Sequence, residues 1–191
     1  MTPIYKQTRV HLGCGQNLFK NWLNIDKFEE RADLQIDLDK TPWPLPDNHF
    51  SEIYMCHVLE HLTDVQKVMD EIWRISKNDS KITIIVPHFS SFAAASPFHK
   101  HFFNSQAMNY FTGKTTENYG KAKFKIKNTR IFWYPSSNEE YLSKSPKRKF
   151  ASYFGEFLDF FINLNRNFFE RIWCYWVGGA FEIKWEISAV K

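Results

Sequence analysis

The chain has 191 residues, of which 43% are hydrophobic and 24% charged, a balance typical of a globular domain and unlike that of a disordered or fibrous protein. Its net charge of +4 is too small to indicate a nucleic-acid partner by itself. Cys14, Cys56 and Cys174 are odd in number and widely spaced, so they predict neither a disulfide framework nor a zinc site. Because no signal peptide or membrane-spanning run is apparent, we expect a cytoplasmic protein.

The first predicted element is a strand that ends in a glycine turn. Residues 9–12 alternate apolar and polar side chains, and Gly13 and Gly15 follow at once. Glycine at both positions lets the backbone bend sharply and lets a ligand lie against its amide groups. Asn17 stands where a dinucleotide fingerprint has its third glycine, so the turn alone is a weak sign of a nucleotide site.

Two carboxylates follow the turn at the ends of further predicted strands. The segment 22–26 ends in Asp26, and the segment 33–38 carries Asp37 near its end. Only residues 18–21 separate the turn from the second strand, which is too short for the crossover helix of an ordinary βαβ unit. We therefore expect an abbreviated first unit, with both carboxylates beside the glycine turn.

The middle of the chain predicts a strand that runs into a helix. A proline-rich loop over residues 41–48 precedes a strand over 50–56. Apolar residues then recur at helical spacing over 64–76. After a break at 78–80, residues 81–87 read as a β-branched strand of the kind buried in a parallel sheet. Strands that alternate with helices favour an α/β fold.

The region after the fifth strand is less regular. Residues 90–103 predict a long loop, and a short helix follows over 105–111. We predict a sixth strand over 125–133, a polar stretch over 136–149 and a closing strand over 180–190.

Residues 150–176 carry aromatic and aliphatic side chains at helical spacing. We interpret this aromatic stripe as core. A lid, a dimer face or an interfacial helix on anionic lipid remain alternatives, the last because Lys147, Arg148 and Lys149 precede the stripe.

Four motifs, taken in order, resemble those of one enzyme family. They are Leu12-Gly13-Cys14-Gly15, Asn24-Ile25-Asp26, Asp37-Leu38 with the loop 44–50, and His57-Val58-Leu59-Glu60-His61-Leu62. Together they resemble the class I S-adenosylmethionine-dependent methyltransferases, specifically the small methyltransferase-domain, type 11-like group. The loop 97–103 resembles a Pro-x-His loop that is common in the same group.

The resemblance implies a Rossmann-like methyltransferase fold. Its sheet has seven mostly parallel strands, helices on both faces and an antiparallel last strand. It also implies one methyltransferase domain over residues 1–191, with a variable insertion or lid region at about 112–176. Cofactors of open α/β sheets bind beyond the carboxyl ends of the strands.

S-adenosylmethionine is the cofactor that the resemblance implies. The glycines would lie against its methionine part, Asp26 would accept hydrogen bonds from both ribose hydroxyls, and Asp37 would meet the adenine amino group. His11 stands where the family most often has an acidic residue, so its contact with the cofactor is either lost or made through water. The implied cofactor-binding residues are His11, Gly13, Cys14, Gly15, Asp26, Asp37, Leu38, Cys56 and His57.

Three histidines are candidates for catalysis, because methyl transfer to oxygen or nitrogen can require a base. His57 follows the fourth strand, where a side chain can face the reactive methyl group, and its alternative is a packed or capping histidine. His99 and His101 stand in the loop where an acceptor would enter. We predict no metal site, because no carboxylate or cysteine accompanies this pair at ligand spacing.

The sequence thus predicts transfer of a methyl group to a small-molecule or glycan-like acceptor, with release of S-adenosylhomocysteine. A non-catalytic methyltransferase-like binding module is one alternative. A nucleic-acid methyltransferase is another, suggested by alternating lysines over 121–127 and disfavoured by the lack of an Asn-Pro-Pro-Tyr-like segment. A nicotinamide-dependent oxidoreductase would need a third glycine and a more distant acid. Peripheral membrane contact and a homodimer stay open.

Overall fold

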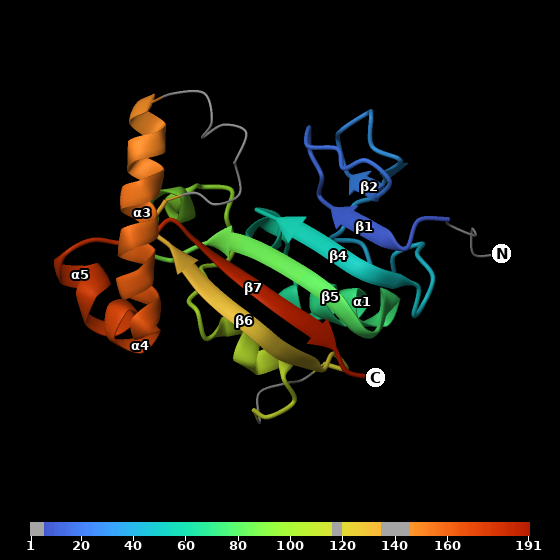
Figure 1. Cartoon of the computed structure of the whole chain (residues 1–191). Helices are drawn as coiled ribbons and strands as arrows, with labels where there is room; N and C mark the ends of the chain where they lie inside the picture. The colour runs from blue at the N-terminus through green and yellow to red at the C-terminus, as the bar shows by residue number, and fades with distance from the viewer. Residues whose placement is uncertain (1–5, 116–119, 135–145) are drawn as a thin grey trace.

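The computed structural model describes residues 6–115, 120–134 and 146–191, and for residues 146–153 the backbone alone. Seven strands form one sheet in the order β3-β2-β1-β4-β5-β7-β6 (Figure 1). β7 runs antiparallel to both of its neighbours, and the other paired strands are parallel. The sheet predicted from the resemblance is thus confirmed. The strands are β1 (Arg9–Leu12), β2 (Leu23–Asp26), β3 (Leu34–Gln35), β4 (Phe50–Cys56), β5 (Ser76–Pro87), β6 (Phe124–Phe132) and β7 (Glu182–Ala189).

The longest helices are α1, behind the central strands in Figure 1, and α3, which stands at the end of β6. α1 begins where the sequence predicts, because the Asp64 side chain accepts a hydrogen bond from the Lys67 N–H. The helical segments are η1 (Leu59–His61), α1 (Val65–Ile75), η2 (Phe92–Ala95), η3 (Ala107–Phe111), α3 (Pro146–Leu164), α4 (Arg166–Phe168), η4 (Phe169–Trp173) and α5 (Cys174–Trp176).

The core lies between the sheet and α1. Strand residues that point to this side are fully buried, and they meet the apolar face of α1. Residues that alternate with them point to the opposite side, where Lys81 lies 2.9 Å from Glu52 and Lys184 lies 2.9 Å from Glu186. The buried residues of α1 are Val68, Met69, Glu71, Ile72 and Ile75.

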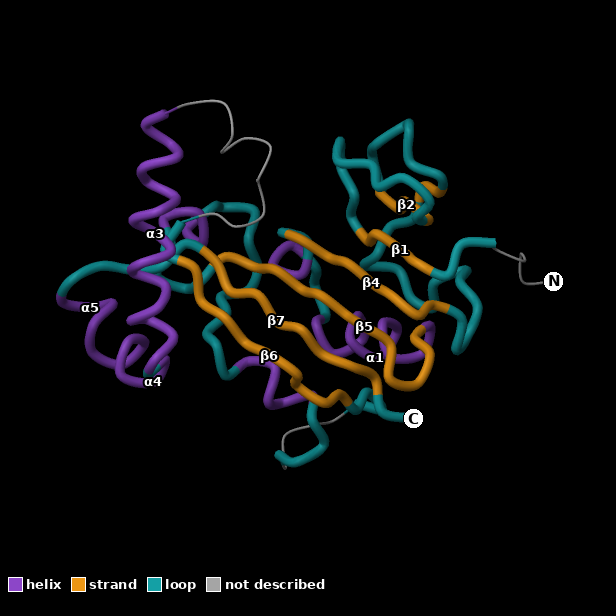
Figure 2. Tube along the Cα trace, in the orientation of Figure 1, coloured by secondary structure: helices purple, strands orange, loops and turns teal. Residues whose placement is uncertain are grey.

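No residue from 13 to 49 is helical, so no helix follows β1 or β2 (Figure 2). The abbreviated first unit is therefore confirmed, and the helices expected there on the second face of the sheet are not formed. Aromatic rings lie there instead: Phe19 stacks on His11 at 4.3 Å between centroids and contacts Tyr54 and Trp22. Ten residues between β1 and β2 leave no room for a helix of ordinary length.

β5 begins earlier than predicted. Ser76 already pairs with Phe50, and the register then shifts before Glu52 pairs with Lys81. The predicted break at 78–80 is a bend inside this strand, where Asp79 takes a positive φ of 56°. Aspartate tolerates the left-handed conformation better than most residues, so the chain turns here without leaving the sheet.

The aromatic stripe is mostly exposed, so the interpretation as core is wrong for most of its side chains. Phe157 is 58% exposed and Phe161 54%, whereas Ile162 and Phe169 are buried. The part of the polar stretch over 135–145 lies outside the described residues. The placement of a variable region at about 112–176 stays a prediction. None of the helices that the structure describes has the length and hydropathy required to cross a bilayer.

α3 is attached to the edge of the sheet by polar side chains. Asn163 accepts a hydrogen bond from the Ile131 N–H at 2.9 Å and donates one to the Ile131 carbonyl at 2.7 Å. Asp159, 4% exposed, accepts from the Trp133 N–H at 2.7 Å. These side chains satisfy backbone groups that an edge strand otherwise leaves to solvent.

Burial raises the pKa of Asp159 from 3.8 to about 6, although the Trp133 N–H acts in the other direction. The folded state therefore binds more protons than the unfolded chain between these values, and the free energy of unfolding falls as pH rises through that window. Asp159→Asn keeps an oxygen that can accept the Trp133 hydrogen bond. We expect it to stabilise the protein by roughly 2–3 kcal/mol above pH 6.5 and hardly at all near pH 4.

Thermal unfolding at the two pH values measures this difference, with Glu30→Gln, an exposed carboxylate that does not act on Asp159, as the control. An Asp159→Asn midpoint below that of the parent at pH 7.5 would show that α3 depends on the charged carboxylate.

Candidate functional site

The glycine turn after β1 is fixed by its contact with the segment after β4. Gly13 has a φ of +67°, and a Cβ placed on it would overlap the methyl groups of Val58. Gly15 has a φ of +49°, and its Cβ position meets open space. The turn therefore needs glycine at 13 for both packing and backbone, and it leaves room above Gly15 for a ligand.

Asp26, at the end of β2, closes over this turn. Its Oδ2 accepts a hydrogen bond from the Gly15 N–H at 2.9 Å, and its Oδ1 accepts from Phe28 at 2.8 Å and Glu29 at 3.0 Å. Burial acts to raise the pKa of Asp26, but the bonds from Phe28, Gly15 and Glu29 outweigh it and hold the pKa below its usual range. The carboxylate is therefore charged at neutral pH.

Asp37 lies near the same edge, beyond β3. Lys27, the residue after Asp26, places its Nζ 3.1 Å from Asp37 Oδ2, and this contact lowers the pKa of Asp37. Leu38 is buried, and its carbonyl accepts a hydrogen bond from Trp43 Nε1 at 3.1 Å. The structure thus places both predicted acids at the end of the sheet that carries the glycine turn.

Two further predicted cofactor residues have buried side chains. His11 is 3% exposed, and burial lowers its pKa to about 4, so it is neutral at pH 7. Cys14 is 2% exposed, and burial raises its pKa to about 11, so it remains a thiol. Cys56, at the end of β4, is half-buried. Any contact of His11 or Cys14 with a ligand at this turn would have to come chiefly from the backbone.

His57 lies between two buried carboxylates. Its Nε2 is 3.0 Å from Glu182 Oε2 and its Nδ1 is 3.4 Å from Glu60 Oε1, and both glutamates are at most 1% exposed. Burial acts to lower the pKa of His57, but the two carboxylates outweigh it and raise the pKa to about 9. This geometry favours a protonated His57, whose positive charge joins β4, η1 and β7. It does not favour His57 as a general base, because a general base must be unprotonated.

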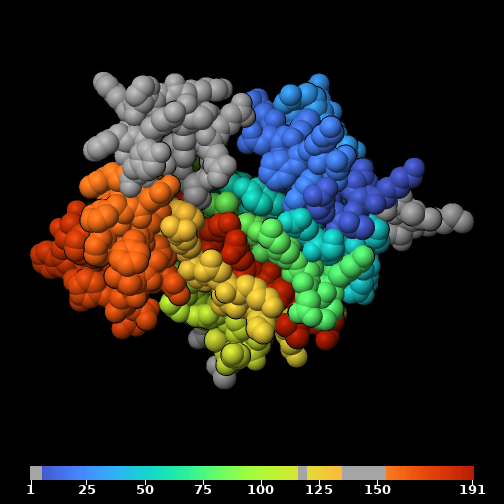
Figure 3. Space-filling view, viewed as in Figure 1, coloured from blue at the N-terminus to red at the C-terminus, as the bar shows by residue number. Residues whose placement is uncertain are grey.

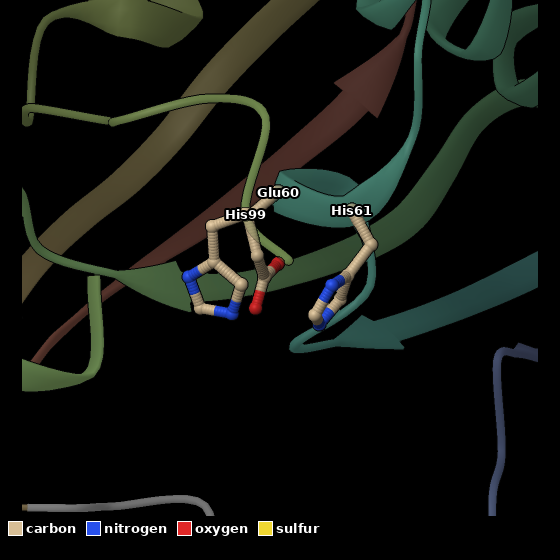
Figure 4. A group of neighbouring side chains, drawn as sticks. All are labelled: Glu60, His61 and His99. Carbon is tan, nitrogen blue, oxygen red and sulfur yellow. The ribbon is translucent and has the colours of Figure 1, made fainter. Parts of the chain in front are cut away.

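The loop after β5 folds back onto η1. The N–H groups of Lys100 and His101 donate hydrogen bonds to the Glu60 carbonyl at 2.8 Å and 3.3 Å. The His99 ring lies 4.5 Å from the His61 ring, nearly perpendicular to it, with the Glu60 carboxylate beside both (Figure 4). His101 Nε2 instead lies 3.4 Å from the carbonyl of Thr63. His57 and His99 are therefore brought together around Glu60, and His101 is not.

Two glutamates at this edge were not singled out from the sequence. Glu60 stands within the segment 57–62, and its spacing of three from His57 is the signal that could have revealed the pair. Glu182 lies 125 residues from His57, so only the topology of the sheet brings them together. The site as a whole thus has an open glycine turn with the charged Asp26 beside it. The histidines of the segment 57–62 and of the loop after β5 lie at the same edge of the sheet.

One family model matches part of the chain. A family model described as "Methyltransferase domain" matches residues 15–84, a range that includes Gly15, Asp26, Asp37 and the segment 57–62. No curated protein sequence matches the chain significantly.

Solved structures share the fold. An S-adenosylmethionine-dependent methyltransferase from Mesorhizobium loti superimposes with a TM-score of 0.55 at 14% identity, covering 93% of this chain and 89% of that chain. One from Archaeoglobus fulgidus gives 0.55 at 16% identity, covering 96% and 86%. Phosphoethanolamine N-methyltransferase 2 from Haemonchus contortus, in complex with S-adenosyl-L-methionine, gives 0.53 at 12% identity, covering 99% of this chain and 50% of that chain.

Gly13→Ala tests the contact between the turn and Val58, in the segment after β4. We expect it to destabilise the protein by roughly 2–4 kcal/mol, because the new Cβ meets Val58 and the positive φ strains an alanine. Gly178→Ala is the control, since nothing lies within 4 Å of its Cβ position. Adding Val58→Ala to Gly13→Ala should recover part of the loss in chemical unfolding. If the double variant is no more stable than Gly13→Ala alone, the whole loss comes from the strained backbone conformation at position 13.

Proposed function

We propose that the chain is a class I S-adenosylmethionine-dependent methyltransferase, which methylates a small-molecule or glycan-like acceptor and releases S-adenosylhomocysteine. The observation that carries this proposal is the glycine turn with open space above Gly15, closed on one side by the charged Asp26. When bound, the cofactor supplies a methyl group on a positively charged sulfur, which an oxygen or nitrogen nucleophile can take by in-line displacement.

The residues present fit this cofactor. A Cβ on Gly15 would occupy the space above the turn, and the absence of one leaves it to the ligand. A carboxylate offers about four acceptor positions, and three backbone N–H groups already use three of them on Asp26. The Lys27 N–H also acts on this carboxylate, so we propose that the ribose hydroxyls bind Asp26 by displacing loop N–H groups. Asp37 is then the acceptor available to the adenine amino group.

We place the acceptor between this turn and the loop 97–103. His99 Nδ1 is buried without a hydrogen-bond partner in the described residues, so it is available to a bound molecule. His101, which faces Thr63, lies at the margin of this region. His57 is held between its two glutamates and contributes a fixed positive charge.

Thermal unfolding with and without S-adenosylhomocysteine tests the cofactor assignment. Ligand at about 100 times its dissociation constant stabilises a protein by about 2.7 kcal/mol, so we expect the midpoint to rise by roughly 5–10 °C. Asp26→Asn should reduce that rise to less than half, because the amide offers fewer acceptor positions and no charge. Glu30→Gln, exposed in the same loop, should leave the rise unchanged.

Each variant is compared with its own unliganded midpoint, which separates loss of binding from loss of stability. A rise with NAD alone would favour an oxidoreductase. Binding of S-adenosylhomocysteine without turnover of any acceptor would favour a non-catalytic module.

The lysines that suggested a nucleic-acid partner have another explanation. Lys125 and Lys127 are exposed on β6, which is an edge strand of the sheet, and the exposed Lys123 directly precedes it. Charged side chains on an edge strand prevent pairing with another chain. We therefore do not extend the proposal to nucleic acid.

We further propose that the exposed aromatic face of α3, α4, η4 and α5 binds an anionic membrane surface. In Figure 3 these segments form the orange and red flank of the molecule. Tyr175 is 70% exposed and Trp176 85%, and amphipathic aromatic rings are the side chains that membrane interfaces favour. Arg171 is exposed within the same segment and supplies charge complementary to anionic lipid. The exposed residues are Phe154, Phe157, Phe160, Phe161, Leu164, Phe168, Ile172, Trp173, Tyr175, Trp176 and Val177.

Co-sedimentation with vesicles tests this second proposal. We expect binding to phosphatidylcholine vesicles that contain phosphatidylserine, weaker binding without it, and about a tenfold or greater loss for Trp176→Ser, because a buried aromatic side chain contributes roughly 1.5–3 kcal/mol. Phe28→Ser, 80% exposed beside β2, is the control. A homodimer that Trp176→Ser dissociates, without vesicle binding, would assign the face to a second copy instead.

A further inference from the structure

Glu60, His61 and His99 converge beyond the carboxyl end of β4 (Figure 4). One possible ligand atom from each lies within 4.8 Å of the others. Glu60 and His61 belong to η1, and His99 belongs to the loop after β5, whose Lys100 and His101 N–H groups bond to the Glu60 carbonyl. The backbone therefore fixes the two segments that carry the three side chains.

Glu60 is a buried acid with unused acceptor capacity. It is 1% exposed, and apart from its ion pair with His57 neither of its oxygens accepts a hydrogen bond from the described residues. A buried carboxylate without hydrogen bonds is costly, so such groups are paired or coordinate metals. Glu182 also faces His57, so two carboxylates share one imidazole. A cation beside Glu60 would balance the second negative charge among these three groups.

The two imidazoles have nitrogen atoms available at the same place. His61 Nδ1 lies 3.2 Å from the carbonyl of Phe98, so it carries the proton and leaves the lone pair on Nε2. Metal-binding histidines typically donate their other N–H to a carbonyl or carboxylate in this way. His99 turns its Nε2 toward Glu60 and His61, whereas its Nδ1, which is buried without a hydrogen-bond partner among the described residues, lies on the far side of the ring (Figure 4). Neither ring is held by contacts that would have to break before an ion could bind.

We propose that Glu60, His61 and His99 bind one divalent transition-metal ion of the zinc class. Two imidazoles and one carboxylate suit zinc and its neighbours and do not suit magnesium or calcium, which prefer oxygen ligands. Zinc lies about 2.0–2.2 Å from such ligands, so the side chains need to close by an ångström or so. The prediction of no metal site considered His99 with His101 alone, and the fold supplies Glu60 and His61.

Three protein ligands leave a fourth position, as in catalytic zinc sites. Its use in catalysis rests on the proposed function and requires the open position to face the region where we place the acceptor. An acceptor hydroxyl bound there would lose its proton to solvent more readily, and its oxygen would form the new bond to the methyl carbon as the carbon–sulfur bond breaks. Binding of the ion itself does not depend on that step.

Calorimetric titration of the tag-free full chain with Zn²⁺, and visible absorption on addition of Co²⁺, test the site. We expect one equivalent of either ion and no binding of Mg²⁺ at the same concentration. His61→Ala and His99→Ala should each weaken binding by at least tenfold, as should Glu60→Gln. The matched control is His101→Gln, two residues from His99 in the same loop, which should leave the affinity unchanged.

Absence of stoichiometric metal binding would overturn the proposal. An equal loss of metal affinity in His101→Gln would also overturn it, because it would show that the ion adsorbs to surface histidines. His61→Ala keeps the test decisive even where Glu60→Gln fails to fold. The rise in midpoint with S-adenosylhomocysteine is measured on the same samples. Loss of metal binding with that rise intact separates failure of this inference from failure of the methyltransferase assignment.

Discussion

The contact of His57 with Glu60 and Glu182 is the interaction on which the carboxyl edge of the sheet depends. It joins the end of β4, the turn η1 and the first residue of β7, which come together from distant parts of the chain. Two buried carboxylates would repel one another without the imidazolium between them. Because Val58 packs under Gly13, the position of His57 also sets the position of the glycine turn. The glycine turn and the segment 57–62 are therefore held in place together.

A second constraint is the short connection between β1 and β2. This connection contains no helix, so other side chains must cover that face of the sheet. Phe19, stacked on His11 and in contact with Tyr54, covers the strands instead. This packing explains why a histidine stands at position 11: a neutral buried ring takes part in an aromatic cluster, whereas a charged acid there would need a partner.

The local pattern of residues predicted most of the fold and part of the site. The strand over 50–56, the helix after Asp64 and the glycine turn follow from periodicity, capping and backbone chemistry, all of which act over short distances. The contact of Glu182 with His57 could not be predicted in this way, because 125 residues separate them and no local pattern pairs them. The interpretation of the aromatic stripe as core was wrong for a related reason. Periodicity shows that a helix has an apolar face, but not whether the fold supplies anything to cover it, and α3 turns only its Ile162 side toward β6.

The place of β7 in the sheet has a consequence for how the protein is made. β7 is synthesised after the six other strands, yet it lies between β5 and β6 and pairs with both. Until it arrives, β5 presents an unpaired edge of β-branched residues, and β6 has no neighbour to hold it. Contacts between segments so far apart in the chain form late and slowly, so the nascent protein carries an adhesive edge during much of its synthesis. The lysines on β6 disfavour edge pairing of the finished sheet, but they do not cover the edge of β5 before β7 is made.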